Sequence, residues 1–174
     1  MVIWMIGMSG AGKSTIGREV YARIKKDKLN TVLIDGDEVR ELFKNDDKEK
    51  DFTIAGRRKS AERLRDLCLW LDRQDINVIC CAICIFPDIL EENRRLYKDY
   101  FEIYVYAPIE VLEDRDTKGL YHAAKSGADK NVVGVQIPFP EPDAPNLIID
   151  TSKDETIESI TSRIIENLEG FSYE

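Results

Sequence analysis

Short apolar runs alternate along the chain with longer segments in which apolar side chains recur every three or four residues. The first pattern is typical of buried strands and the second of amphipathic helices. The expected strands are Val2–Ile6, Thr31–Ile34, Ile76–Ile85, Tyr100–Tyr106 and Leu147–Asp150. The expected helices run from Lys13 to Lys26, Ala55 to Arg73, Pro87 to Tyr97, Ile109 to Asp116 and Lys153 to Leu168. This alternation predicts an α/β fold, with a doubly wound parallel sheet of five strands and helices on both faces. Because Ile76–Ile85 is the most apolar run, we expect it to be the central strand.

The stretch from Thr117 to Pro145 breaks this rhythm. It is rich in lysine, glycine and proline and lacks a long apolar run. So long an insertion in a compact domain is usually a lid or a binding segment. We therefore expect one domain, residues 1–174, with a lid at about 117–145. The only histidine, His122, falls in this lid and is expected at the surface, while Phe171–Glu174 should be loosely held.

Acidic residues outnumber basic ones, with 33 Asp and Glu against 25 Lys and Arg. A general nucleic-acid-binding protein would show a basic excess, so we expect no nucleic-acid partner. Met1 leads directly into the first strand, and no apolar run approaches the length of a membrane span. We expect a cytoplasmic protein without a signal peptide or a membrane partner.

Four cysteines are present, and Cys81 and Cys84 have the spacing of a redox or zinc pair. No second pair accompanies them, and both lie in the apolar run Ile76–Ile85. Buried thiols in the core are therefore the better interpretation.

The first strand leads into a glycine-rich loop and then into a helix. The loop fits the pattern G-x-x-x-x-G-K-[ST] at every fixed position, in the strand–loop–helix setting that the pattern requires. Its backbone N–H groups can converge on phosphates at the start of a helix, and Lys13 can reach the terminal phosphates. The hydroxyl of Ser14 can bind Mg²⁺. The sequence thus predicts a phosphate-loop fold that binds ATP and Mg²⁺ through Gly7, Met8, Ser9, Gly10, Ala11, Gly12, Lys13, Ser14 and Thr15.

Two carboxylates, Asp35 and Asp37, follow the second strand. Open α/β sheets bind ligands at this edge, and phosphoryl transfer needs one carboxylate near the metal and another near the attacking hydroxyl. Asp35 and Asp37 are therefore candidate catalytic residues together with Lys13. The alternative is a helix N-cap with an acidic first turn, a part that Asp37 could also play.

Further along, Phe52 stands alone in a charged stretch, as either a local anchor or a stacking platform for a base. The helix after it begins with Arg57, Arg58 and Lys59, although cations at a helix N-terminus oppose its dipole. This cost suggests an anionic partner, and a solvated run of charges is the alternative.

With these pieces in place, the chain resembles adenylylsulfate kinases over nearly its whole length. The segments that carry the resemblance are Gly7–Thr15, Asp35–Arg40, Arg115–Tyr121, Lys130–Gly134 and the proline-rich run before Asp150 and Thr151. That family moves the γ-phosphate of ATP to the ribose 3′-hydroxyl of adenylylsulfate.

The resemblance implies a role for each matching residue. Asp37 would be the general base, and Asp35 with Ser14 would support the metal. Arg115 would lie with the nucleotide. The acceptor would be held by Arg40, Phe52, Arg57, Ser60, Cys84, Lys118, Gly119 and Leu120, with Phe52 stacking on its base. The resemblance also suggests a homodimer.

The chain departs from the family mainly in the part that would hold the acceptor. Ser60 replaces an asparagine, Val132 replaces the second stacking aromatic, and Cys84 stands where some members have a phosphorylated serine. Gln136 and Ile137 replace positions that are usually polar or acidic. Losing one of two aromatic rings that stack on the base would weaken acceptor binding by ~1–3 kcal/mol. Three functions therefore stay open: adenylylsulfate kinase; a kinase of another nucleotide-linked small acid, such as cytidine diphosphoramidate; and an ATP-binding regulatory module.

Overall fold

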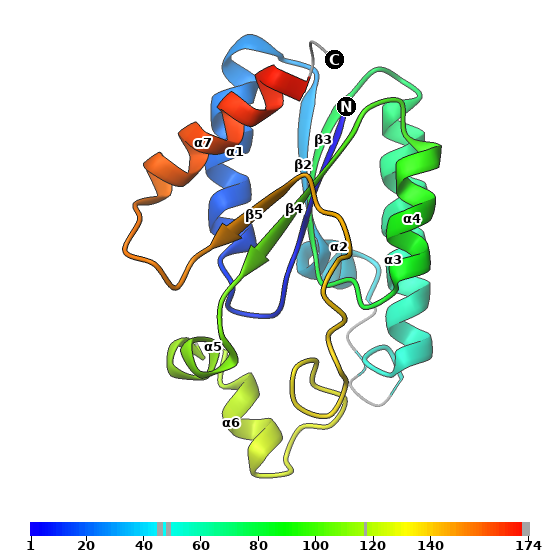
Figure 1. Ribbon diagram of the computed structural model, residues 1–174. Coiled ribbons are helices and arrows are strands. Elements are labelled where there is room, and N and C mark those ends of the chain that lie inside the picture. The colour runs from blue at the N-terminus through cyan, green and yellow to red at the C-terminus, as the bar shows by residue number, and fades with distance from the viewer. Residues whose placement is uncertain (45–46, 48–49, 117, 172–174) are drawn as a thin grey trace.

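The computed structural model describes residues 1–44, 47, 50–116 and 118–171. Five strands and seven helices follow one another in this part of the chain (Figure 1). The strands are β1 (Val2–Ile6), β2 (Thr31–Asp35), β3 (Asn77–Ala82), β4 (Tyr100–Tyr106) and β5 (Leu147–Asp150). The helices are α1 (Lys13–Asp27), α2 (Gly36–Leu42), α3 (Ile54–Asp72), α4 (Pro87–Leu96), α5 (Ile109–Arg115), α6 (Leu120–Lys125) and α7 (Ile157–Phe171).

The strands form one parallel sheet in the order β2-β3-β1-β4-β5, which confirms the predicted fold class. The predicted central strand was wrong: β1 lies in the middle, paired with β3 on one side and β4 on the other. The expected strand is also shorter, because β3 ends at Ala82 and leaves Cys84 and Ile85 beyond it. Both β1 and β3 are almost entirely buried, so apolar character alone could not rank them.

Helices cover both faces of the sheet, α1 and α7 on one and α3 and α4 on the other (Figure 1). Side chains alternate along β1, so that Ile3 and Met5 join the core beneath α1 and α7. Trp4 and Ile6 point the other way and join the core beneath α3 and α4. The loops that follow all five parallel strands therefore reach one edge of the sheet, where α2, α5 and α6 lie.

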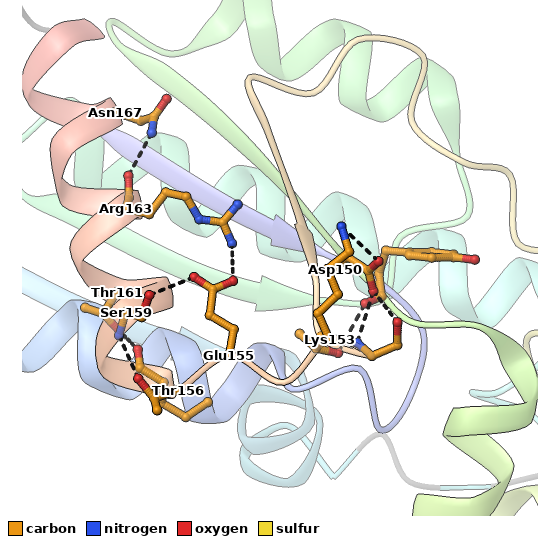
Figure 2. A network of polar contacts seen from close by, with 12 residues as sticks. Asp150, Lys153, Glu155, Thr156, Ser159, Thr161, Arg163 and Asn167 are labelled. Atoms are coloured by element: carbon orange, nitrogen blue, oxygen red, sulfur yellow. Dashed lines mark hydrogen bonds and ion pairs between the residues drawn. The ribbon is translucent and has the colours of Figure 1, made fainter.

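The last helix begins at Ile157 rather than at Lys153, because polar contacts hold the preceding residues out of the helix (Figure 2). Asp150 accepts hydrogen bonds from the backbone and hydroxyl of Ser152. Glu155 accepts from Ser159 and Arg163, and the Thr156 hydroxyl accepts from the Ser159 N–H, as a capping side chain does.

At the other end of α7, Phe171 was expected to be loosely held, and this was wrong. Its ring makes an edge-on contact with Phe101, with 5.3 Å between ring centroids. Residues 172–174 lie outside the described part of the chain.

The stretch from 118 to 145 contains α6 and an isolated bridge between Val133 and Ile137. His122 is exposed there, as expected. Thr117, at the start of the expected lid, lies outside the described residues, and the division into core and lid stays a prediction.

All four cysteines are buried and free, in line with the expectation of core thiols. In the part of the chain that the structure describes, no cluster of metal-ligating side chains occurs. No helix among the described residues is long and apolar enough to cross a membrane.

The close contact of α1 with the sheet depends on Gly17. A Cβ at this position would overlap the Sγ atom of Cys81 and touch Met5 and Leu33. We expect Gly17→Ala to lower the free energy of unfolding by about 1–2 kcal/mol in urea titrations, since overpacking outweighs the gain in helix propensity.

Gly170, in the last turn of α7, is the matched control, because a Cβ there would meet nothing within 4 Å. Gly170→Ala should raise stability by about 0.5 kcal/mol. Adding Cys81→Ala to Gly17→Ala should recover part of the loss, which a double-mutant cycle measures. Equal effects of the two glycine substitutions would contradict this view of the α1 interface.

Candidate active site

The glycine-rich loop lies between β1 and α1, at the middle of the sheet's carboxyl edge. Gly12 is the residue just before α1 and has a left-handed φ of 101°, a conformation that glycine adopts without steric cost. A Cβ at Gly7 would overlap the carbonyl oxygen of Val105 in β4. The loop can therefore lie against the neighbouring strand only with glycine at its start.

The carbonyl oxygens of residues 8–11 each accept a side-chain hydrogen bond. Lys13 Nζ donates to Met8 O (2.8 Å), Tyr121 Oη to Ser9 O (2.9 Å), Arg115 Nη1 to Gly10 O (3.4 Å) and Thr151 Oγ1 to Ala11 O (3.0 Å). In a trans peptide the N–H points away from the carbonyl. Fixing these carbonyls therefore turns N–H groups of the loop toward the opposite side, where an anion can bind, except that of Ala11, which donates to Met8 O (3.3 Å).

Asp35 lies at the end of β2 and is 7% exposed. Its Oδ1 accepts the N–H of Asp37 (2.9 Å), and its Oδ2 accepts the hydroxyl of Ser14 from the phosphate loop. The helix cap foreseen as an alternative role for Asp37 is thus provided by Asp35. The Asp37 carboxylate is therefore not used as the cap and remains exposed in the first turn of α2.

Asp37 is paired with Lys118 from the segment before α6. Their Oδ2 and Nζ atoms are 2.6 Å apart, although both side chains are largely exposed. Burial by itself would raise the pKa of Asp37, but the hydrogen bond and charge of Lys118, with Arg40 and Lys13, hold this pKa below its usual value. Asp37 is therefore ionised at neutral pH and can accept a proton.

Lys13 is only 9% exposed. Burial lowers the pKa of its ammonium to about 8, against the opposing influence of Cys81, Asp37 and Asp35. Asp35, Asp37 and Lys118 all influence the pKa of Lys13, so these four charged side chains lie close together. The structure thus brings together the three predicted catalytic residues.

Phe52 carries two guanidinium groups against its ring. The Cζ atoms of Arg40 and Arg57 lie 4.7 and 5.4 Å from the ring centroid. Arg57 donates to the carbonyls of Phe52 (3.0 Å) and Asn131 (2.9 Å). Burial, reinforced by Arg40, lowers the pKa of Arg57 to about 10. Two cations held this close favour an anion between them.

The polar atoms of Arg40 support this interpretation. Its Nε and Nη1 are buried, and neither has a hydrogen-bond partner among the described residues. Unpaired buried donors are costly, and an anionic ligand would satisfy them. The neighbouring Arg58 behaves differently, because it pairs with Asp88 (2.8 Å) and lies over Phe86.

Several other residues predicted for the site lie apart from these charged clusters or make no contact that indicates a role. Arg115 donates to the carbonyl and hydroxyl of Thr151 as well as to Gly10, so it braces the loop from outside. The thiol of Cys84 is 1% exposed and donates to the Phe86 carbonyl, and burial raises its pKa to about 11. Ser60 is half-buried in α3, Gly119 is the residue just before α6, and Leu120 is the first residue of α6.

Reasoning from sequence missed two residues that contact the loop, Tyr121 and Thr151. Both fall within segments that resemble the family, but their own spacing gave no sign of hydrogen bonds to residues more than 100 positions away. It also missed the contacts of Gln136, whose side chain joins the backbones of Val132 and Ala124 within the stretch 118–145.

The chain is similar to several known kinases. A family model described as "Adenylylsulphate kinase" matches residues 1–150. An adenylyl-sulfate kinase of Halothermothrix orenii is 36% identical over 99% of this chain and 91% of that protein. A cytidine diphosphoramidate kinase of Campylobacter jejuni is 35% identical over 96% of this chain and 95% of that protein.

Among solved structures, the APS kinase CysC of Mycobacterium tuberculosis, in complex with AMPPNP and APS, superposes with a TM-score of 0.86. The two chains are 26% identical, and the match covers 97% of this chain and 96% of the other. Shikimate kinase from Aquifex aeolicus, 19% identical with a TM-score of 0.62, shares the fold. The family match and the nearly full-length relatives show that this chain belongs to the adenylylsulphate kinase family of phosphate-loop kinases.

Proposed function

We propose that this protein transfers the γ-phosphate of ATP to a ribose hydroxyl of a nucleotide-linked acidic acceptor, with adenylylsulfate as the first candidate. One observation carries the proposal: the exposed, ionised carboxylate of Asp37 lies within electrostatic reach of the phosphate-loop ammonium of Lys13. A proton acceptor and a phosphate-binding ammonium group thus lie in one site, as phosphoryl transfer requires.

In the proposed reaction, Asp37 takes the proton of the acceptor hydroxyl while the oxygen of that hydroxyl attacks the γ-phosphorus of ATP. The bond from that phosphorus to the bridging oxygen breaks, and ADP leaves. Lys13 moves from the Met8 carbonyl to the phosphate oxygens, while the loop N–H groups hold the phosphates in line.

Mg²⁺ fits the oxygen donors at the start of α1. The hydroxyl of Ser14 and the carboxylate of Asp35 are hydrogen-bonded to each other beside the loop. Hard oxygen ligands suit this ion, which also keeps waters and takes substrate phosphates. When bound, it would neutralise charge on the phosphates.

Arg40, Arg57 and Lys118 supply the cationic surroundings that a phosphosulfate or a related anion needs. Because Arg40 and Arg57 both lie against the Phe52 ring, a base can stack on that ring only if one of the two guanidinium groups moves partly away from it. A homodimer is also proposed, on the family resemblance alone. The cytoplasmic location expected from the sequence is likewise a proposal.

Cytidine diphosphoramidate is the second candidate acceptor. The burial of Val132 supports this candidate. This side chain is 2% exposed and belongs to the hydrophobic cluster that also contains Tyr121 and Ala124, so no aromatic ring at this position faces the acceptor. A one-sided contact suits a smaller base. The Campylobacter kinase named for that compound is almost as similar as the adenylyl-sulfate kinases.

The two acceptors, and the alternative of a non-catalytic ATP-binding module, are separated by one assay. The protein is incubated with Mg-ATP and each acceptor in turn while ADP is followed. We expect acceptor-dependent ADP with adenylylsulfate. ADP only with cytidine diphosphoramidate would establish the second candidate, and ADP release independent of both would remove the proposed kinase activity toward these acceptors.

Asp37→Asn should lower kcat by about 10²–10⁴-fold, because the amide cannot accept the proton, and it should leave ATP binding nearly intact. Asp88→Asn is the matched control. Asp88 is also an exposed carboxylate in the first turn of a helix, and it is paired with a cation from another element. The control should keep kcat within about twofold of the wild type. Retained transfer in Asp37→Asn would remove Asp37 as the base.

ATP affinity should fall with rising pH above about 8, the pKa to which burial lowers Lys13. Bound phosphates favour the charged ammonium and raise this pKa. Binding is therefore strongest below the free-state pKa and weakens by up to about tenfold per pH unit above it, with proton uptake.

Calorimetry at several pH values, in buffers of different ionisation enthalpy, measures both the affinity and the proton uptake. Lys13→Arg should bind less tightly but without this pH dependence, because its guanidinium stays charged. An affinity of the wild type that stays constant through this range would show that Lys13 is already fully charged or does not contact the phosphates.

A further inference from the structure

Tyr121 joins the segment around α6 to the phosphate loop across 112 positions of sequence. Its side chain is 2% exposed, and its hydroxyl donates to the carbonyl of Ser9 over 2.9 Å. We propose that Tyr121 is a positioning residue: it holds the phosphate loop in its binding shape through Ser9 and makes that shape depend on the seating of α6.

The loop needs such a hold because its own backbone is permissive. Gly10 and Gly12 both have positive φ angles, a region that glycine enters and leaves at little cost. Of the four side chains that donate hydrogen bonds to the loop carbonyls, two make bonds that are weak or are lost when phosphate binds. Lys13 must leave Met8 O to reach phosphate, and Arg115 is exposed, with a long contact of 3.4 Å. The single proton of the Thr151 hydroxyl is shared between Ala11 O (3.0 Å) and Tyr106 O (3.1 Å), so the Tyr121 hydroxyl is the most persistent donor to the loop.

The Tyr121 ring is itself firmly placed. The backbone N–H of Tyr121 donates to the Asp116 carboxylate (3.1 Å), which fixes the start of α6 to the end of α5. On the other side, Gly134 leaves just enough room: a Cβ there would lie 2.8 Å from Met8 Sδ and 3.9 Å from Tyr121 Cε1. The lid thus touches two successive residues of the loop, Met8 and Ser9.

The same turn of chain also reaches the proposed base. Lys118, three residues before Tyr121, is paired with Asp37. A displacement of α6 therefore changes the surroundings of the base and releases the Ser9 carbonyl together. In this way the phosphate loop and the acceptor side of the site are linked through one short helix.

This inference rests on the proposed ATP binding, and the test separates the two. Tyr121→Phe keeps the ring and removes the hydroxyl. Tyr97→Phe is the matched control, since Tyr97 is buried and its hydroxyl also donates to a backbone carbonyl, that of Arg65 (3.1 Å), on the α3 and α4 side. Binding of Mg–AMP-PNP is titrated for the wild type and for both variants.

We expect the Kd of Tyr121→Phe to rise about five- to tenfold while that of Tyr97→Phe stays within about twofold, although both variants lose similar stability. Hydrogen exchange should quicken in the peptide covering residues 7–12 only in Tyr121→Phe. If the wild type binds no AMP-PNP, the proposed function fails. If the wild type binds and Tyr121→Phe matches it in Kd and loop exchange, the positioning role is overturned.

Should Tyr121→Phe not fold, Gly134→Ala displaces the segment beside the Tyr121 ring without removing the hydroxyl, because its Cβ would lie 2.8 Å from Met8 Sδ and its φ of 91° disfavours alanine. It must weaken AMP-PNP binding and quicken loop exchange in the same direction. Unchanged binding and exchange in that variant would likewise overturn the inference.

Discussion

The carbonyl oxygens of the loop between β1 and α1 must be kept away from the phosphates that its N–H groups bind. Each carbonyl left facing an anion would repel it and would remove a donor from the opposite side of the peptide unit. Here four consecutive carbonyls are taken up by side chains from α1, α5, α6 and the residue after β5. The loop owes its shape to these distant donors as much as to its glycines.

The parallel sheet makes this arrangement possible. Because every strand runs in the same direction, the segments after β1, β2, β4 and β5 all emerge at one edge. With β1 in the middle of the sheet, its loop and the start of α1 lie within reach of Asp35 on one side and of Arg115 and Thr151 on the other. A loop at the end of an edge strand would have had neighbours on one side only.

Charge is concentrated at this edge in a way that the acidic composition conceals. The chain has a net charge of −8, yet Lys13, Arg40, Arg57 and Lys118 converge around two carboxylates. Burial lowers the pKa of both Lys13 and Arg57, so these cations are held at a cost in free energy. A bound anion offsets that cost, which is why such a site favours phosphates over neutral ligands.

The sequence by itself determined the local features. Apolar runs and helical periodicity predicted each strand and five of the seven helices in the described residues, but neither α2 nor α6, and the loop motif with Asp35 and Asp37 pointed to the carboxyl edge of the sheet. These features depend on neighbours within a few residues, so local propensity and spacing are enough to reveal them. The tertiary structure decided what depends on partners far along the chain, such as the central place of β1 in the sheet. It also decided the bond from Tyr121 to Ser9. A hydrogen bond between residues 112 positions apart leaves no periodic trace in the sequence, because only the packing of α6 against the loop brings its two atoms together.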